Sequence, residues 1–133
     1  MLDNAVAQNL PDLPANGVLV MNWGPLHTLH YLVEFDYVDS PYGHQLCVRI
    51  KVSRVSPVKD KIGFPEWNQV DGLTREMIID AARTWGLNPL ELSEFCFRTA
   101  SNLVDRLFEE EFPGRPRTSK FVDPYSGDAI CKY

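Results

Sequence analysis

The chain has little of what several classes of small protein require. Its cysteines are Cys47, Cys96 and Cys131, an odd number with no CxxC spacing, so we expect buried thiols in a reducing compartment and not a disulfide framework. No stretch approaches the ~20 apolar residues that span a bilayer. The first residues lack the basic and apolar blocks of a secretory signal. These absences predict a cytoplasmic protein with no membrane partner.

The chain also has fewer basic than acidic residues. Thirteen Lys plus Arg stand against eighteen Asp plus Glu, for a net charge of -5. Binding to nucleic acid depends on neutralising phosphates, so the balance predicts no nucleic-acid partner. The densest basic stretch, residues 114–120, follows the acidic run 109–111, and the two mostly cancel as a solvated charged surface.

What is present fits an ordinary globular protein of one domain. The chain has 133 residues, of which 44% are hydrophobic, enough to bury a core. Residues 1–16 contain two prolines and no sustained period, which predicts an N-terminal arm that is ordered only if it packs on something. Residues 17–133 are expected to form a single α+β domain.

Alternating residues predict strands in the first half. Residues 17–23 are apolar and end at Gly24 and Pro25, as expected of a short buried strand. Residues 29–38 and 45–55 each alternate between apolar and polar side chains, a period of two that indicates strands with one buried face. The turn residues between them predict an antiparallel hairpin. Residues 56–72 are expected to form a long loop of the kind that is usually functional or mobile.

Helical spacing follows in the second half. A first helix is predicted over 74–85, capped by Thr74 and stopped by Gly86, with an apolar face formed by Met77, Ile78, Ala81, Ala82 and Trp85. The second has Asn88 as cap, Pro89 at the first position and Glu91 at the third. Its apolar stripe is formed by Leu92, Phe95, Cys96, Leu103, Leu107 and Phe108. A break into two helices near Thr99 is left open, and a second hairpin is predicted over residues 119–133.

The predicted order of elements is strand, strand, helix, helix, strand, strand. Each hairpin alone is marginally stable in water. One four-stranded antiparallel sheet with two helices on its apolar face gives every element a buried side. The sequence therefore predicts a two-layer ββααββ domain of the α+β class.

Three stretches carry a family resemblance over about two thirds of the chain. "YGHQLCVRIKVSRV" (42–55) is similar to a His-Gly-His followed by a strand, and "LN" (87–88) precedes "RTASNLVDRLF" (98–108). "KFVDPYSGDAICKY" (120–133) stands where the family has a hairpin with a ligand-anchoring glutamate. Together with the ββααββ order, these stretches resemble the tunnelling-fold family of 6-pyruvoyltetrahydropterin and 6-carboxytetrahydropterin synthases.

The resemblance implies a zinc site, but the ligands depart from the family's pattern. These enzymes hold zinc with three histidines and keep a fourth position open for the substrate. Here a phenol replaces one ligand, in Tyr42-Gly43-His44. His27 has about the family's spacing, although His30 is its substitute if residues 29–38 are the first strand. At most two imidazoles remain, so we expect no zinc cofactor; His27 and His44 are the weak metal candidates, with surface or turn positions as the alternative.

The family's proton-transfer residues also have no counterpart. Ala82, Arg83 and Thr84 occupy the positions of its Leu-Asp-His, so the sequence favours a non-catalytic protein. A ligand site is still implied. Asp123 matches the anchoring carboxylate with one carbon fewer, and its alternative role is to begin a turn before a proline. Thr99 and Ser101 are the other candidate ligand-binding residues, with helix capping as their alternative.

Three functional hypotheses follow. The first is a homologue of pterin and deazapurine synthases that lacks their chemistry and binds a heterocycle or serves as a partner subunit, in a homo-oligomer formed through sheet edges. The second is a small acidic protein of the immunity or inhibitor type with a basic protein partner, based on Glu34, Asp36, Asp39 and the run 109–111. The third is an active zinc-dependent synthase or lyase that uses His27, His44 and a carboxylate.

Overall fold

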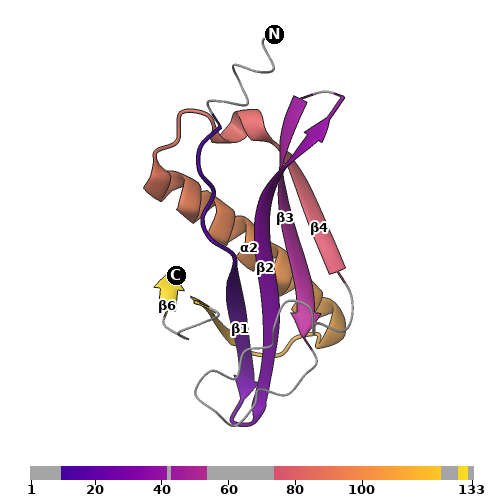
Figure 1. Ribbon diagram of the computed structural model, residues 1–133. Helices are drawn as coiled ribbons and strands as arrows, with labels where there is room; N and C mark the ends of the chain where they lie inside the picture. Colours follow the sequence, from indigo (N-terminus) through magenta and orange to yellow (C-terminus); the bar gives the residue numbers. More distant parts are fainter. Residues whose placement is uncertain (1–9, 42, 54–73, 124–128, 132–133) are drawn as a thin grey trace.

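One antiparallel sheet and one long helix make up the fold. The computed structural model describes residues 10–41, 43–53, 74–123 and 129–131. Six strands lie in the order β4-β3-β2-β1-β5-β6, and the helix α2 (Pro89–Glu111) crosses one face of the sheet (Figure 1). The chain is therefore α+β, as its sequence predicts.

The first three strands form a continuous antiparallel meander. They are β1 (Gly17–Gly24), β2 (His27–Ser40) and β3 (Gly43–Ser53). Val33 pairs with Gly17 on one side and with Ile50 on the other. Gly43 begins β3 with a φ of 120°, a backbone conformation that favours glycine. The predicted hairpin and the predicted short strand before it are both confirmed.

The segment predicted as the first helix is a strand. β4 (Thr74–Asp80) pairs with β3, with Met77 opposite Val48, and is followed by a short 3₁₀ turn, η2 (Ala81–Thr84). Met77 and Ile79 pack against the core, whereas Ile78 between them is exposed. The edge of β3 supplies backbone partners for this segment, and pairing with it replaces the helix that the local spacing suggests.

The second predicted helix is confirmed, and it has no break. α2 begins with a capping box: Glu91 N donates to Asn88 Oδ1 at 2.8 Å, and Asn88 N donates to Glu91 Oε1 at 3.1 Å. At mid-helix, Thr99 Oγ1 donates to the carbonyl of Phe95 at 2.8 Å, so its hydroxyl is satisfied inside an unbroken helix. The alternative of a break into two helices near Thr99 is therefore wrong, and α2 is the only one of the two expected α-helices found in the described residues.

The last hairpin is confirmed, but the expected four-stranded arrangement is wrong. β5 (Thr118–Val122) pairs with β6 (Ala129–Cys131), and the predicted turn between them lies outside the described residues. β5 also pairs with β1, with Phe121 opposite Leu19. β1 thus lies between the two predicted hairpins, and with β4 it brings the sheet to six strands. The sequence pattern shows which segments are extended, but not which edges they join.

Both faces of the sheet centre are buried. The main core lies between α2 and the sheet, and its largest fully buried side chains are Tyr31, Phe108 and Phe121. On the opposite face a second cluster is formed by Val18, Val20, Leu32 and Val122. His30 is only 5% exposed, so the prediction that 29–38 has one buried face is wrong at this position.

Part of the predicted N-terminal arm is attached to β2. Asn16 Oδ1 accepts a hydrogen bond from Phe35 N at 3.1 Å, and Tyr37 Oη donates to the carbonyl of Pro11 at 2.7 Å. Leu13 packs against the main core. The predicted loop 56–72 lies outside the described residues. Within the described part of the chain, no helix has the length and apolar character needed to cross a membrane.

Candidate functional site

The candidate zinc ligands do not meet within one chain. His27 begins β2, while His44 pairs with Asp39 at the other end of that strand. At ~3.3 Å per residue, these two ends are about 40 Å apart, so His27 and His44 cannot share an ion. Across the described residues, no group of three or more His, Cys, Asp or Glu side chains is arranged to hold a metal.

Each histidine has local contacts instead. His27 stacks on Trp23 with ring centroids 5.4 Å apart. His44 Nδ1 lies 2.6 Å from Asp39 Oδ1 beside the β2–β3 turn. Burial lowers the pKa of His30. Tyr42, the phenol in place of the third ligand, lies outside the described residues.

One of the three predicted ligand-binding residues lines a cavity. Ser101 faces a cavity of about 220 Å³ between α2 and β5. Thr99 does not line it, and its hydroxyl is bonded to the carbonyl of Phe95. Asp123 follows the end of β5, is partly buried, and does not line the cavity either.

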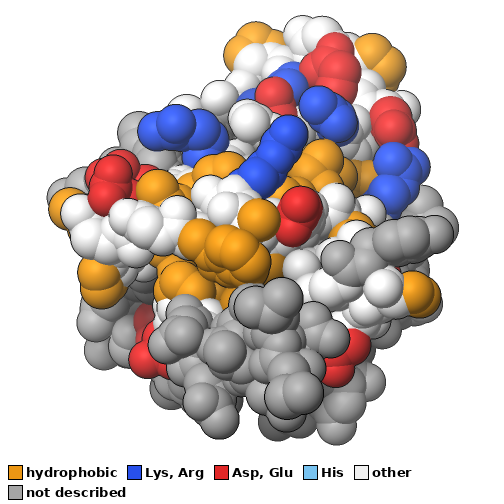
Figure 2. All heavy atoms as spheres, turned by 90° about the horizontal axis from the view of Figure 1, so that it is seen from above, with side chains coloured by type: hydrophobic (Ala, Val, Ile, Leu, Met, Phe, Trp, Pro, Cys, Tyr) orange, Lys and Arg blue, Asp and Glu red, His pale blue; other side chains and the backbone are white. Residues whose placement is uncertain are grey.

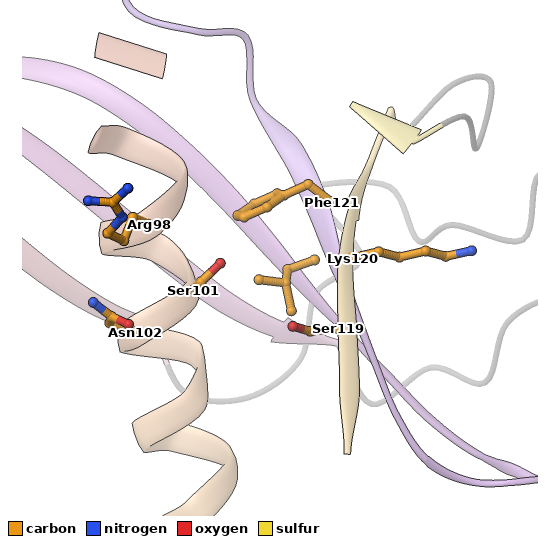
Figure 3. A pocket seen from close by; sticks show the side chains of 7 residues that line it. Arg98, Ser101, Asn102, Ser119, Lys120 and Phe121 are labelled. Atoms are coloured by element: carbon orange, nitrogen blue, oxygen red, sulfur yellow. The ribbon is translucent and has the colours of Figure 1, made fainter. Parts of the chain in front are cut away.

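We call this cavity the α2–β5 groove; it is lined by Leu19, Arg98, Ser101, Asn102, Ser119, Lys120 and Phe121. Figure 3 shows Ser101 of α2 and Ser119 of β5 pointing toward one another, with the ring of Phe121 extending toward the helix. The side chain of Lys120 points to the other side of β5 (Figure 3), so Lys120 borders the groove with its backbone.

Two periodicities bring these side chains together. Arg98, Ser101 and Asn102 are three and four positions apart, so they lie on neighbouring turns of one side of α2. Ser119 and Phe121 are two positions apart and share a face of β5. The ring of Phe121 lies 4.7 Å from that of Phe97, a contact that fixes the strand against the helix.

Arg98 is the cation available to a ligand in the groove. Among the described residues that line the groove, none carries a carboxylate, an imidazole or a thiol. Neither Arg98 nor Lys120 forms an ion pair with any residue that the structure describes. Arg117, which is close in sequence, is already occupied: it lies 2.7 Å from Asp105 and 2.6 Å from Glu109. The backbone N–H of Gly114 and then Arg117 lower the pKa of Glu109 accordingly.

The described residues of the groove supply hydrogen-bonding and apolar groups. Its polar atoms belong to a guanidinium, two hydroxyls and an amide, over an apolar floor of Leu19 and Phe121. General acid–base catalysis needs a group that titrates near neutral pH within hydrogen-bond reach, and none of the described lining residues is of that type. Burial raises the pKa of the nearby Cys96 thiol to about 12, which keeps it protonated.

Sequence analysis missed Arg98, Asn102 and Ser119 as site residues. Arg98 and Asn102 flank the predicted Ser101 at helical spacing, a signal that could have identified the helical side of the groove. No local pattern identified Ser119, because its position in the groove depends on the pairing of β5 with β1. Comparisons of the chain with protein-family models, with curated proteins and with solved structures found no match.

Proposed function

We propose that this chain is a non-catalytic binding protein that holds a small, flat molecule with an anionic edge in the α2–β5 groove. One observation carries the proposal: Arg98, without an ion pair among the described residues, lines a groove that has an apolar floor and two facing hydroxyls. Figure 3 shows the guanidinium turned away from β5, at the outer border of the groove. A guanidinium binds carboxylate or phosphate oxygens with two parallel hydrogen bonds.

The dimensions of the groove limit the ligand. Its volume of about 220 Å³ corresponds to about seven water molecules at ~30 Å³ each. A single ring with one charged substituent fits this space, and the ring of Phe121 at the floor offers an aromatic surface. Ser101 and Ser119 would then donate or accept at the edge of the ligand.

A heterocycle remains a candidate ligand. The residue proposed to bind its charged edge is Arg98, in place of the Asp123 that the family resemblance implies. Kinship with the pterin synthases is a separate hypothesis. It is supported by the α+β class and by Ser101 in the groove, whereas the placement of β1 between the hairpins departs from the four-stranded plan.

The acidic-binder hypothesis is the second candidate, and the ion pairs argue against it. Four of the six acids on which it rests already have partners in the same chain. Glu34 is paired with Arg49 and Lys51, Glu109 with Arg117, Glu110 with Arg75, and Asp39 lies against the imidazole of His44. Figure 2 shows acidic and basic side chains interspersed on the end of the molecule seen from above. A steering field needs one sign of charge to be concentrated on a surface.

A titration with benzoate, a one-ring carboxylate, tests the groove. We expect NMR shift changes at Ser101, Ser119 and Phe121, with a dissociation constant raised about tenfold or more in Arg98→Leu, because a charge-assisted hydrogen bond contributes ~1.5–3 kcal/mol. Arg106→Leu is the matched control, since it removes an exposed cation from the same helix outside the groove.

Two outcomes contradict the proposal. Unchanged benzoate affinity in Arg98→Leu rules out Arg98 as the anchor. Shift changes confined to residues outside the groove rule out the groove itself.

A further inference from the structure

β4 forms an edge of the sheet. It pairs with β3 along its length, and no other strand among the described residues pairs with its outer side. Figure 1 shows β4 as the outermost strand beyond β3. Such an edge presents backbone N–H and C=O groups that another strand can pair with.

Three of the seven residues of β4 are charged, but its centre is not. Natural edge strands are commonly protected by charges, prolines or bulges. The centre of β4, Met77 to Ile79, is uncharged, while Arg75, Glu76 and Asp80 lie toward its ends. Ile78 is 45% exposed and points to the face opposite Met77 and Ile79, which pack against the core.

We propose that β4 pairs antiparallel with β4 of a second copy of the chain, around a two-fold axis at Met77. The two sheets would then form one continuous sheet with both helices on the same face. A two-fold axis perpendicular to the sheet keeps each residue on the same face in both copies. In an antiparallel pair, directly opposed residues point to the same face of the sheet. An axis between two residues would oppose neighbours that point to different faces, so the axis has to pass through a residue.

The charges of β4 favour Met77 as the position of the two-fold axis. An axis at Ile78 would place Glu76 opposite the partner's Asp80, and an axis at Glu76 or Arg75 would oppose that residue to itself. Like charges directly opposite one another destabilise a sheet. An axis at Ile79 would pair the strand only over its last three residues.

With the axis at Met77, all seven residues of β4 are paired and no like charges are opposed. Glu76 lies opposite the partner's Ile78, and Arg75 lies opposite the partner's Ile79. Arg75 is already bound to Glu110 of its own helix, at 2.6 Å, so its aliphatic stem is the part that contacts the neighbouring isoleucine.

Two substitutions at Ile78 test both the dimer and its register. By sedimentation equilibrium at micromolar concentration, we expect the wild type at about twice the chain mass of 15.2 kDa. Ile78→Glu places a carboxylate opposite Glu76 and should raise the dimer dissociation constant at least tenfold. Ile78→Lys is the matched control: it places an ammonium opposite Glu76 and should retain the dimer. Ile78 is exposed, and circular dichroism verifies that both variants fold.

A disulfide supplies a second measurement. In a Cys131→Ser background, Met77→Cys places two thiols across the axis, where opposed Cα atoms are ~4.5–5.5 Å apart, within the range that a disulfide spans. Oxidation should link this variant into a covalent dimer. Ile79→Cys, two positions from the axis, should remain monomeric on a non-reducing gel.

Several results would overturn this interface. They are a monomeric wild type, dissociation of both Ile78 variants, dissociation of neither, and cross-linking through Ile79→Cys in preference to Met77→Cys. None of these measurements depends on the ligand of the α2–β5 groove.

Discussion

At the scale of single residues, His30 is the titratable group whose environment departs most from the sequence expectation. It pairs with Val20 of β1 and Ser53 of β3, and it is 5% exposed. The alternation of 29–38 places it correctly opposite the core-facing residues. Its burial did not follow from that alternation, because the burial depends on the cluster around Val20 and Leu32 on the second face of the sheet.

Burial of His30 predicts that stability declines in mild acid. Burial lowers the pKa of His30 in the folded chain below its ordinary value of 6.5, so the unfolded chain binds a proton first as the pH falls. The free energy of unfolding therefore rises with pH in this range and falls as pH drops through about 6.5 toward the folded pKa. Urea unfolding from about pH 7.5 to 5.5 measures this slope.

His30→Gln isolates the contribution of the imidazole to that slope. Glutamine keeps a polar group at the position and does not titrate, so the variant should show a shallower decline in stability than the wild type. Equal slopes in the two proteins would mean that other groups cause the pH dependence.

At the scale of elements, segment 74–85 shows how two periodicities can share the same residues. Met77, Ile78, Ala81 and Ala82 fit a helical face, yet Met77 and Ile79 also alternate with exposed neighbours as in a strand. The segment forms a strand and not a helix because the edge of β3, which is distant in sequence, supplies its backbone partners. Trp85, expected on a buried helical face, is 50% exposed.

The prediction of α2 was confirmed because its signals are local. The capping box of Asn88 and Glu91 lies within one turn, and the apolar stripe runs at helical spacing along the whole element. The question of a break at Thr99 was decided by a hydrogen bond that stays inside the helix.

Docking of α2 on the sheet predicts a sharp difference between its two sides. Ala100 is fully buried against the main core, so Ala100→Leu should lower the free energy of unfolding by about 1–3 kcal/mol through overpacking. Arg106→Leu, on the exposed side, should change it by no more than about 0.5 kcal/mol. Urea denaturation gives both values, and similar effects at the two positions would contradict the observed orientation of α2.

At the scale of the whole molecule, only one residue that lines the candidate site, Ser101, was predicted. Ser101 was identified on the helix, but Ser119 and Phe121 join it only because β5 pairs with β1. That pairing connects segments more than one hundred residues apart, and a single sequence contains no local signal for it. Asp123, predicted by the family resemblance, lies just past the groove.

Strand order predicts a gradient of local stability. β1 and β2 have a strand on each side, whereas the three-residue β6 is the last strand of the sheet and, among the described residues, pairs only with β5. Hydrogen exchange measured by NMR should therefore be slowest for amides of β1 and β2 and much faster for those of β6. Protection of β6 equal to that of β2 would show that the sheet opens only as a unit.

The position of β1 also bears on how the protein is made. Val18 pairs with Val122, more than one hundred residues later, so β1 lacks its second neighbour until β5 has left the ribosome. During that interval the nascent chain exposes an unpaired apolar strand edge that is prone to aggregation. Premature termination before residue 118 would leave this edge permanently uncovered, and such fragments would aggregate or require a chaperone.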